Sequence, residues 1–307
     1  MKSVTIVQSS DRKFLALVAW ISVLAVSDLP DIVSRYAAGS VPASLFWYKI
    51  SFLCLFLALC ILVRRVSKLL PFAVIMLVFF LALAASDMLK NAGWWKGLIP
   101  ENAKPSFFMV YLRPFARDIG VTLTVIAALF LIRKKRSGFF LVRGEPGAEI
   151  EPVPWLGIGK GESWMKFGWI FAIAASLIVA IPTFWSIKPE GRLLVKCIPL
   201  LPAVLFYAAI NAFNEEIYFR STLLSTLTEV IGKTNTLLIN VVFFGLAHYL
   251  YGSPPGLTGA LMTGFLAYLL GKAMLETKGF AWPWFIHFLP DVVIFCSYAI
   301  LWMKQLP

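Results

Sequence analysis

Residues Asn211 to Arg220 read Asn-Ala-Phe-Asn-Glu-Glu-Ile-Tyr-Phe-Arg, and this stretch decides how the rest of the chain is interpreted. An apolar run precedes it and an amphipathic run follows it, which predicts the middle of one long membrane helix from Arg192 to about Ile231. Two adjacent carboxylates and an arginine are costly at that depth in a bilayer, and ionisable residues there normally face a polar cavity. We therefore expect a functional site on this helix.

Helical spacing separates the charged residues of this stretch into two groups. Glu216 and Arg220 are four residues apart, in the order that favours an ion pair on one helix face. Glu215 is rotated by roughly 100° from Glu216 about the helix axis. Asn211 lies one turn before Glu215 and can hydrogen-bond to it. The spacing predicts that Glu216 is paired with arginine while Glu215 is free to do chemistry.

The composition is that of an all-α, polytopic membrane protein. Of the 307 residues, 60% are hydrophobic and only 14% are charged, and several apolar runs approach the length of a membrane span. The net charge of +12 does not indicate a nucleic-acid partner, because the basic residues cluster beside the apolar runs, as the positive-inside rule requires. The four cysteines fall within apolar runs and show no metal-ligand spacing. The expected partner surface is therefore the lipid bilayer.

About nine transmembrane helices are expected, with a C-terminal catalytic helix bundle. The expected spans are Phe14–Val33, Leu45–Val63, Leu69–Ser86, Asp118–Ile132, Lys166–Ile187, Arg192–Ile231, Asn235–Tyr251, Gly256–Leu275 and Trp282–Met303. The apolar run Phe14–Val26 at the start of the first span also resembles the core of a signal peptide. Residues 87–117 are expected to form an interfacial loop with aromatic anchors.

Three regions are expected along the chain. Residues 1–136 form a four-span module that ends in the basic stretch Arg133 to Arg136, residues 137–164 form a cytoplasmic linker, and residues 165–307 form the core. The distribution of lysine and arginine predicts a cytoplasmic N-terminus. We expect an integral protein of a prokaryotic plasma (inner) membrane.

The chain contains two histidines, and both lie in apolar runs of the C-terminal half. His248 lies one helical turn after Phe244, and His287 lies one turn before Asp291, with Pro290 expected to kink the helix between them. A single histidine in a membrane helix usually makes an interhelical hydrogen bond. Two of them alongside a glutamate pair and an aspartate instead favour an active site.

The chemistry that such a set supports is hydrolysis. A carboxylate and an imidazole can hold a water molecule and take its proton. A second imidazole and a neighbouring polar group can donate hydrogen bonds to the oxyanion that forms on an attacked carbonyl. The chain has no Gly-x-Ser-x-Gly and no His-Glu-x-x-His motif, which argues against a serine hydrolase and a standard zinc protease.

Three motifs in this order resemble those of the CAAX prenyl-protease and bacteriocin-processing (ABI, CPBP) family of glutamate-type intramembrane endopeptidases. They are Glu215-Glu216-x-x-x-Arg220, Phe244-x-x-x-His248 and His287-x-x-x-Asp291, and the resemblance extends over about residues 164–303.

The resemblance implies a mechanism without an obligatory metal or other cofactor. In it, Glu215 activates water with His248, and Glu216 and Arg220 brace the site. His287 with Asp291 would stabilise the oxyanion, although many members of the family have asparagine at the last position. Because an aspartate donates a hydrogen bond only when protonated, Asp291 can alternatively accept a bond and orient His287. The substrate would be a membrane-bound protein or peptide with a prenylated or lipidated C-terminus, a leader peptide or a sorting tail.

Two other functions fit parts of the sequence. The chain could be a non-catalytic scaffold or immunity protein of the same fold. It could also be a proton-coupled transporter with Glu215 and Asp291 as relay groups, but the internal symmetry common in transporters is not evident. Two histidines and two carboxylates could bind zinc; we favour a glutamate base, since one of the glutamates is expected to be held by arginine.

Overall fold

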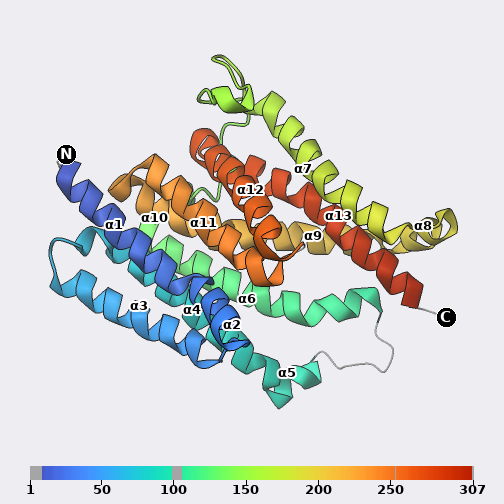
Figure 1. The fold of residues 1–307 in the computed structure, drawn as a ribbon, viewed down its shortest axis with the longest axis horizontal. Helices are drawn as coiled ribbons and strands as arrows, with labels where there is room; N and C mark the ends of the chain where they lie inside the picture. The colour runs from blue at the N-terminus through green and yellow to red at the C-terminus, as the bar shows by residue number, and fades with distance from the viewer. Residues whose placement is uncertain (1–8, 99–105, 253, 306–307) are drawn as a thin grey trace. The chain divides into compact units, whose positions relative to one another are not determined.

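The computed structural model describes residues 9–98, 106–252 and 254–305. These residues are mostly helical and form no β-strand, only two isolated bridges, so the expected all-α class is confirmed. The α-helices (Figure 1) are α1 (Ser9–Val26), α2 (Leu29–Ala38), α3 (Ser44–Leu62), α4 (Leu70–Asn91), α5 (Gly93–Leu98), α6 (Phe107–Arg133), α7 (Trp164–Ile187), α8 (Gly191–Cys197), α9 (Leu201–Glu215), α10 (Thr222–Ile231), α11 (Lys233–Tyr251), α12 (Gly256–Thr277) and α13 (Ala281–Gln305).

Seven helical stretches in the described part of the chain are long and apolar enough to cross a membrane. One of them is the 41-residue stretch Gly191–Ile231, which confirms the long helix that was expected to carry the glutamates. The pair α1 and α2, bent by 48°, makes an eighth if it is one broken span. α11 is not among the seven, and it carries polar side chains such as Asn235 and Asn240. The expected count of nine is therefore approximate.

The expected interfacial loop over residues 87–117 is largely helical in the structure. α4 continues to Asn91, α5 follows, and α6 begins at Phe107 instead of at Asp118; residues 99–105 of that loop lie outside the described residues. The reason is an aromatic face: Phe107 and Phe115 of α6 are buried in a core with Tyr207 and Phe295. Burial of these rings stabilises about three additional turns of helix, which the charged residues Arg113 and Arg117 had obscured.

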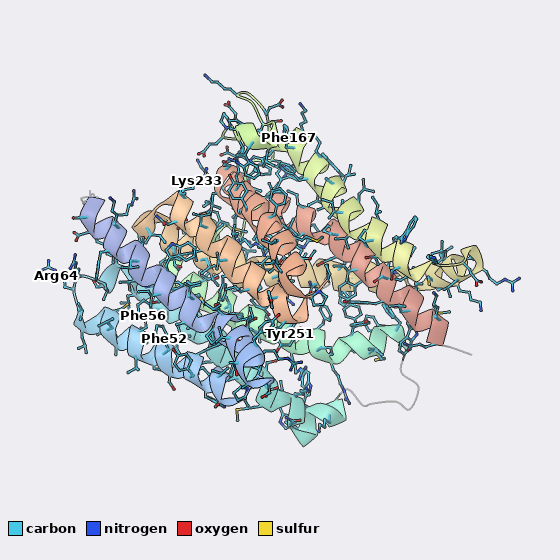
Figure 2. The ribbon with its side chains drawn as sticks, viewed as in Figure 1. Phe52, Phe56, Arg64, Phe167, Lys233 and Tyr251 are labelled. Carbon is cyan, nitrogen blue, oxygen red and sulfur yellow. The ribbon has the colours of Figure 1, made fainter. Side chains whose placement is uncertain are left out.

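The chain divides into two compact units, each assembled from three stretches. The first unit consists of Met1–Ala82, Thr124–Phe139 and Tyr218–Lys272. Within it α1 packs against α3, α10 and α11, and α10 packs against α11, whose two ends are marked by Lys233 and Tyr251 in Figure 2. The second unit consists of Leu83–Leu123, Phe140–Ile217 and Ala273–Pro307. The predicted modules with boundaries at 136 and 164 stay predictions.

In the second unit α13 packs against α7, α8 and α9. The segment that precedes α7 holds the start of α13: Phe280 N–H donates to the carbonyl of Val142 at 2.8 Å, and Trp282 Nε1 donates to the carbonyl of Pro146 at 2.9 Å. Gly144 has φ +74°, and a Cβ there would lie 2.5 Å from the Thr277 carbonyl oxygen, so this close approach requires glycine. These contacts set the position of α13 a few residues before His287.

Candidate active site

The helix that carries the two adjacent glutamates changes its hydrogen-bond pattern between them. α9 ends at Glu215, and Glu216–Ser221 form a π-helical turn before α10 begins. A π turn contains one more residue than an α turn, and such turns occur frequently at functional sites. Sequence reasoning assumed α-helical spacing throughout and missed this turn, because the apolar residues on both sides predict an uninterrupted helix.

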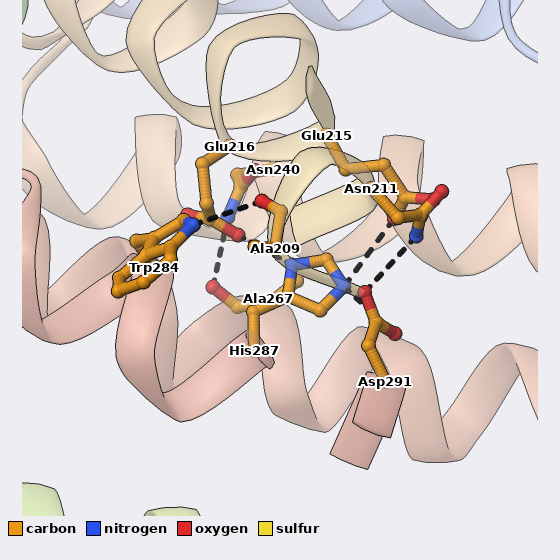
Figure 3. Close-up of polar contacts among 9 residues, drawn as sticks. All are labelled: Ala209, Asn211, Glu215, Glu216, Asn240, Ala267, Trp284, His287 and Asp291. Atoms are coloured by element: carbon orange, nitrogen blue, oxygen red, sulfur yellow. Dashed lines mark hydrogen bonds and ion pairs between the residues drawn. The ribbon is translucent and has the colours of Figure 1, made fainter. Parts of the chain in front are cut away.

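Both glutamates approach the same imidazole ring from opposite sides (Figure 3). Nδ1 of His287 lies 2.8 Å from Oε1 of Glu216, and Nε2 of His287 lies 3.5 Å from Oε2 of Glu215. Because an ionised carboxylate only accepts hydrogen bonds, Nδ1 is the donor to Glu216. Within the second unit, both glutamates therefore approach the same side chain, His287, whereas uniform α-helical spacing had suggested that they face different partners.

Asp291 completes the surroundings of His287 one turn along α13. Its Oδ1 lies 3.9 Å from Nε2 of His287. Its Oδ2 accepts a hydrogen bond from Nδ2 of Asn211 at 3.1 Å, and the same amide nitrogen donates to Oε1 of Glu215 at 3.1 Å. The expected bond between Asn211 and Glu215 is thus present, and Asp291 is an acceptor in this arrangement. The Asn211 amide joins two carboxylates that would otherwise repel each other.

The two glutamates differ in their exposure. The Glu216 side chain is 0% exposed, whereas that of Glu215 is 21% exposed. Among the described residues, Oε2 of Glu215 has no hydrogen-bond donor within reach apart from its ion-pair approach to His287. Because its side chain is the more exposed, Glu215 is the carboxylate of the pair that a water molecule can approach more easily.

The remaining predicted residues gather in the first unit, around Phe244. Nδ1 of His248 lies 3.0 Å from the Phe244 carbonyl oxygen, and the two rings are 4.3 Å apart between centroids. The guanidinium carbon of the buried Arg220 lies 3.9 Å from the centroid of the Phe244 ring, a cation–π contact. The expected one-face pairing of Phe244 with His248 is confirmed, and Phe244 also contacts Arg220.

The predicted site residues thus form two groups. The second unit brings together Asn211, Glu215, Glu216, His287 and Asp291, and the first unit brings together Arg220, Phe244 and His248. The expected ion pair of Glu216 with Arg220 and the expected approach of His248 to Glu215 join residues of different units. Both stay predictions.

Sequence reasoning missed three residues that support the site from within the second unit. Oγ1 of Thr122 on α6 lies 2.6 Å from Oδ1 of Asn214 and donates to it, and both groups are buried. Trp284 on α13 donates from Nε1 to the carbonyl of Ala209 on α9 at 3.1 Å. Thr122 lies in an apolar run and Trp284 resembles an interfacial anchor, so neither had a sequence signal for these contacts. Asn214 could have been found, since it directly precedes Glu215.

These supporting residues also border a cavity of about 420 Å³ beside the site. Its lining is almost wholly apolar and comes from three helices of the second unit. The lining residues are Ile119, Thr122, Leu123, Ala209, Ile210, Phe213, Asn214 and Trp284. Because Asn214 adjoins Glu215 and Trp284 lies one turn before His287, the cavity borders the polar cluster.

The arrangement of the polar side chains also bears on metal binding. In the described ranges, no group of three or more histidine, cysteine, aspartate or glutamate side chains is arranged to hold a metal ion. The hydrogen bond from Nδ1 of His287 to Glu216 explains why this ring does not present that nitrogen as a ligand.

One segment of the chain is similar to a known protein family. Residues 198–293 match the model of the family described as Type II CAAX prenyl endopeptidase Rce1-like. This segment carries all three motifs, and the match confirms the resemblance to CAAX proteases drawn from them. Neither the curated proteins nor the solved structures contain a match to the chain.

Proposed function

We propose, from the match of residues 198–293 to the CAAX prenyl endopeptidases, that this chain is an intramembrane endopeptidase with Glu215 as its general base. One observation carries the assignment of roles. His287 is held at Nδ1 by the fully buried Glu216, while the more exposed Glu215 lies beside Nε2. A positioned imidazole next to a carboxylate with acceptor capacity is the arrangement that activation of water requires.

The reaction uses these groups in order. Glu215, with His248, takes a proton from water as the water oxygen attacks the peptide carbonyl carbon. The carbonyl oxygen becomes an oxyanion, which accepts a hydrogen bond from Nε2–H of His287 in its doubly protonated form, the form that the surrounding carboxylates of Glu216, Glu215 and Asp291 favour. The C–N bond then breaks, and the proton on Glu215 passes to the leaving amine nitrogen. Asp291 acts through its position beside Nε2 and its bond from Asn211.

The substrate is expected to reach the site from within the bilayer. Glu215 and His287 lie on helical stretches with the length and apolar composition of membrane spans. The substrate would therefore be a membrane-associated protein or peptide, and a prenylated C-terminus is the first class to examine because of the family match.

The test is cleavage by the full-length protein in liposomes. A farnesylated peptide that ends in a CAAX sequence should be cut, and the same peptide without the lipid should be cut poorly. Glu215→Gln should lower kcat by about 10²- to 10⁴-fold, the range for loss of a general base. Glu190→Gln, which changes an exposed glutamate before α8, is the matched control and should behave as the unmodified protein. Full activity of Glu215→Gln would refute the assignment of the base.

A further inference from the structure

The first helix pair of the chain brings two carboxylates into the first unit. α1 ends at Val26 and α2 begins at Leu29, with a bend of 48° between them. Ser27 stabilises the break, since its hydroxyl donates to the Leu24 carbonyl at 2.9 Å and accepts from Leu29 N–H at 3.2 Å. Asp28 lies in the break and Asp31 follows in the first turn of α2. Neither belongs to the segment that matches the protease family.

One lysine neutralises only part of this charge. Nζ of Lys49, on α3, lies 3.1 Å from Oδ1 of Asp28 and also contacts Oδ2 of Asp31. The Lys49 side chain is only 5% exposed. Two carboxylates and one ammonium leave a net charge of −1, and an uncompensated charge in a poorly solvated site is costly.

A histidine on α11 is placed to compensate for that charge. α2 packs against α11, and the hydroxyl of Tyr36 lies 2.8 Å from that of Tyr249, the residue after His248. Asp28 is close enough to His248 for the two to interact electrostatically. Nδ1 of His248 is engaged by the Phe244 carbonyl oxygen, so Nδ1 carries a proton and Nε2 is the nitrogen that gains or loses one. A protonated His248 would bring the cluster to neutrality.

We propose that Asp28 is a positioning residue for His248: the Asp28 carboxylate stabilises the positive charge that develops on the His248 imidazole while this ring and Glu215 together draw the proton from the attacking water, and the proton then rests on Glu215. The role of His248 in this statement rests on the proposed function. The electrostatic interaction between Asp28 and His248 does not, and through it the N-terminal helices supply a counter-charge for the imidazole of the Phe-x-x-x-His motif. Lys49 and Asp31 hold the Asp28 carboxylate in place.

The first test detects the contact without any enzyme assay. Because the chain has two histidines, the ¹³C and ¹⁵N NMR signals of its imidazole rings form two sets. The set that remains in His287→Gln belongs to His248. Asp28→Asn should shift the His248 signals and leave those of His287 in place. Asp28→Glu should restore most of the shift. Asp11→Asn, at a half-exposed aspartate on α1, is the matched control and should move neither set.

Asp28→Asn is expected to fold, since it leaves Lys49 paired one-to-one with Asp31. If it does not fold, the reciprocal measurement decides: His248→Gln should shift the carboxyl ¹³C signal of Asp28 and leave that of Asp11 in place. Unchanged His248 signals in folded Asp28→Asn, or an unchanged Asp28 signal in His248→Gln, would overturn the proposal.

Activity supplies the second readout. Asp28→Asn should lower kcat about tenfold with little change in KM, as expected for about 1.4 kcal/mol of lost stabilisation of the charged imidazole, and Asp28→Glu should recover it. Equal losses in both variants would indicate a merely structural role and overturn the proposal. If the unmodified protein cleaves no peptide while the NMR shifts are found, the proposed function fails and the electrostatic interaction of Asp28 with His248 stands.

Discussion

Nδ1 of His287 donates a hydrogen bond of 2.8 Å to Oε1 of Glu216, a carboxylate with 0% exposed side-chain surface. This bond joins the first residue of the π turn to the second turn of α13, and it determines which ring nitrogen remains available. Since Nδ1 is engaged, any hydrogen bond from this ring to a substrate must come from Nε2. Glu216 is therefore placed to orient His287 and Glu215 is placed to react.

Substitutions at Glu216 should separate orientation from charge. Glu216→Gln retains an oxygen that accepts the bond from His287 but removes the negative charge. The loss of a charge-assisted hydrogen bond, about 1.5–3 kcal/mol, corresponds to a fall in kcat/KM of about 10- to 100-fold. Glu216→Ala should lower activity further and also lower Tm, because it leaves a buried N–H unpaired. Peptide cleavage and thermal unfolding measure the two effects; activity equal to the unmodified protein in Glu216→Gln would contradict this role.

Position 211 should tolerate a smaller side chain better than a negatively charged side chain of similar size. Its amide nitrogen donates to Glu215 and to Asp291, both at 3.1 Å. Asn211→Asp is nearly isosteric, but it replaces the donor by a third carboxylate in contact with the other two. We expect Asn211→Asp to lower both activity and Tm more than Asn211→Ala does, because like charges that share one site repel each other. A higher Tm for Asn211→Asp than for Asn211→Ala would show that the amide is not the bridge.

Asp291 should tolerate an amide better than a truncation. In Asp291→Asn the side-chain oxygen still accepts from Asn211, and the amide adds a donor near Nε2 of His287. Asp291→Ala removes both. We expect Asp291→Asn to retain at least tenfold more activity than Asp291→Ala, about 1.4 kcal/mol in transition-state terms, in the same cleavage assay. Equal activities would mean that neither the charge nor the hydrogen bond of this residue matters to the reaction.

The packing of α13 against α7 depends on a glycine. A Cβ at Gly168 would lie 2.3 Å from Cε3 of Trp282, near the start of the helix that carries His287. Gly168→Ala should therefore destabilise the protein by about 1–3 kcal/mol through overpacking. Gly120→Ala in α6 is the matched control: a Cβ there meets nothing within 4 Å, so a gain of up to about 1 kcal/mol from helix propensity is expected. Thermal unfolding in detergent would measure both, and equal Tm values would contradict the prediction.

Composition and spacing along the chain predicted the helical membrane class, the long helix through Glu215 and Glu216, and a set of candidate site residues. The physical reason is that a charged group inside an apolar run is expensive, so its presence indicates a polar site whatever the neighbouring helices do. Local spacing also predicted contacts one turn apart, and those of Asn211 with Glu215 and of Phe244 with His248 are confirmed. Both depend on helix geometry alone.

Hydrogen bonds between residues that are far apart in the sequence depend on how the helices pack. The hydrogen bond from His287 to Glu216 spans 71 residues and that from Thr122 to Asn214 spans 92, and no spacing rule relates such residues. The π turn could not be predicted from the sequence either, because its one additional residue leaves the apolar pattern on both sides of it intact. Which glutamate meets which nitrogen of His287 therefore follows from the packing of α9 against α13, since a periodic pattern specifies the buried face of a helix but not the helix that covers it.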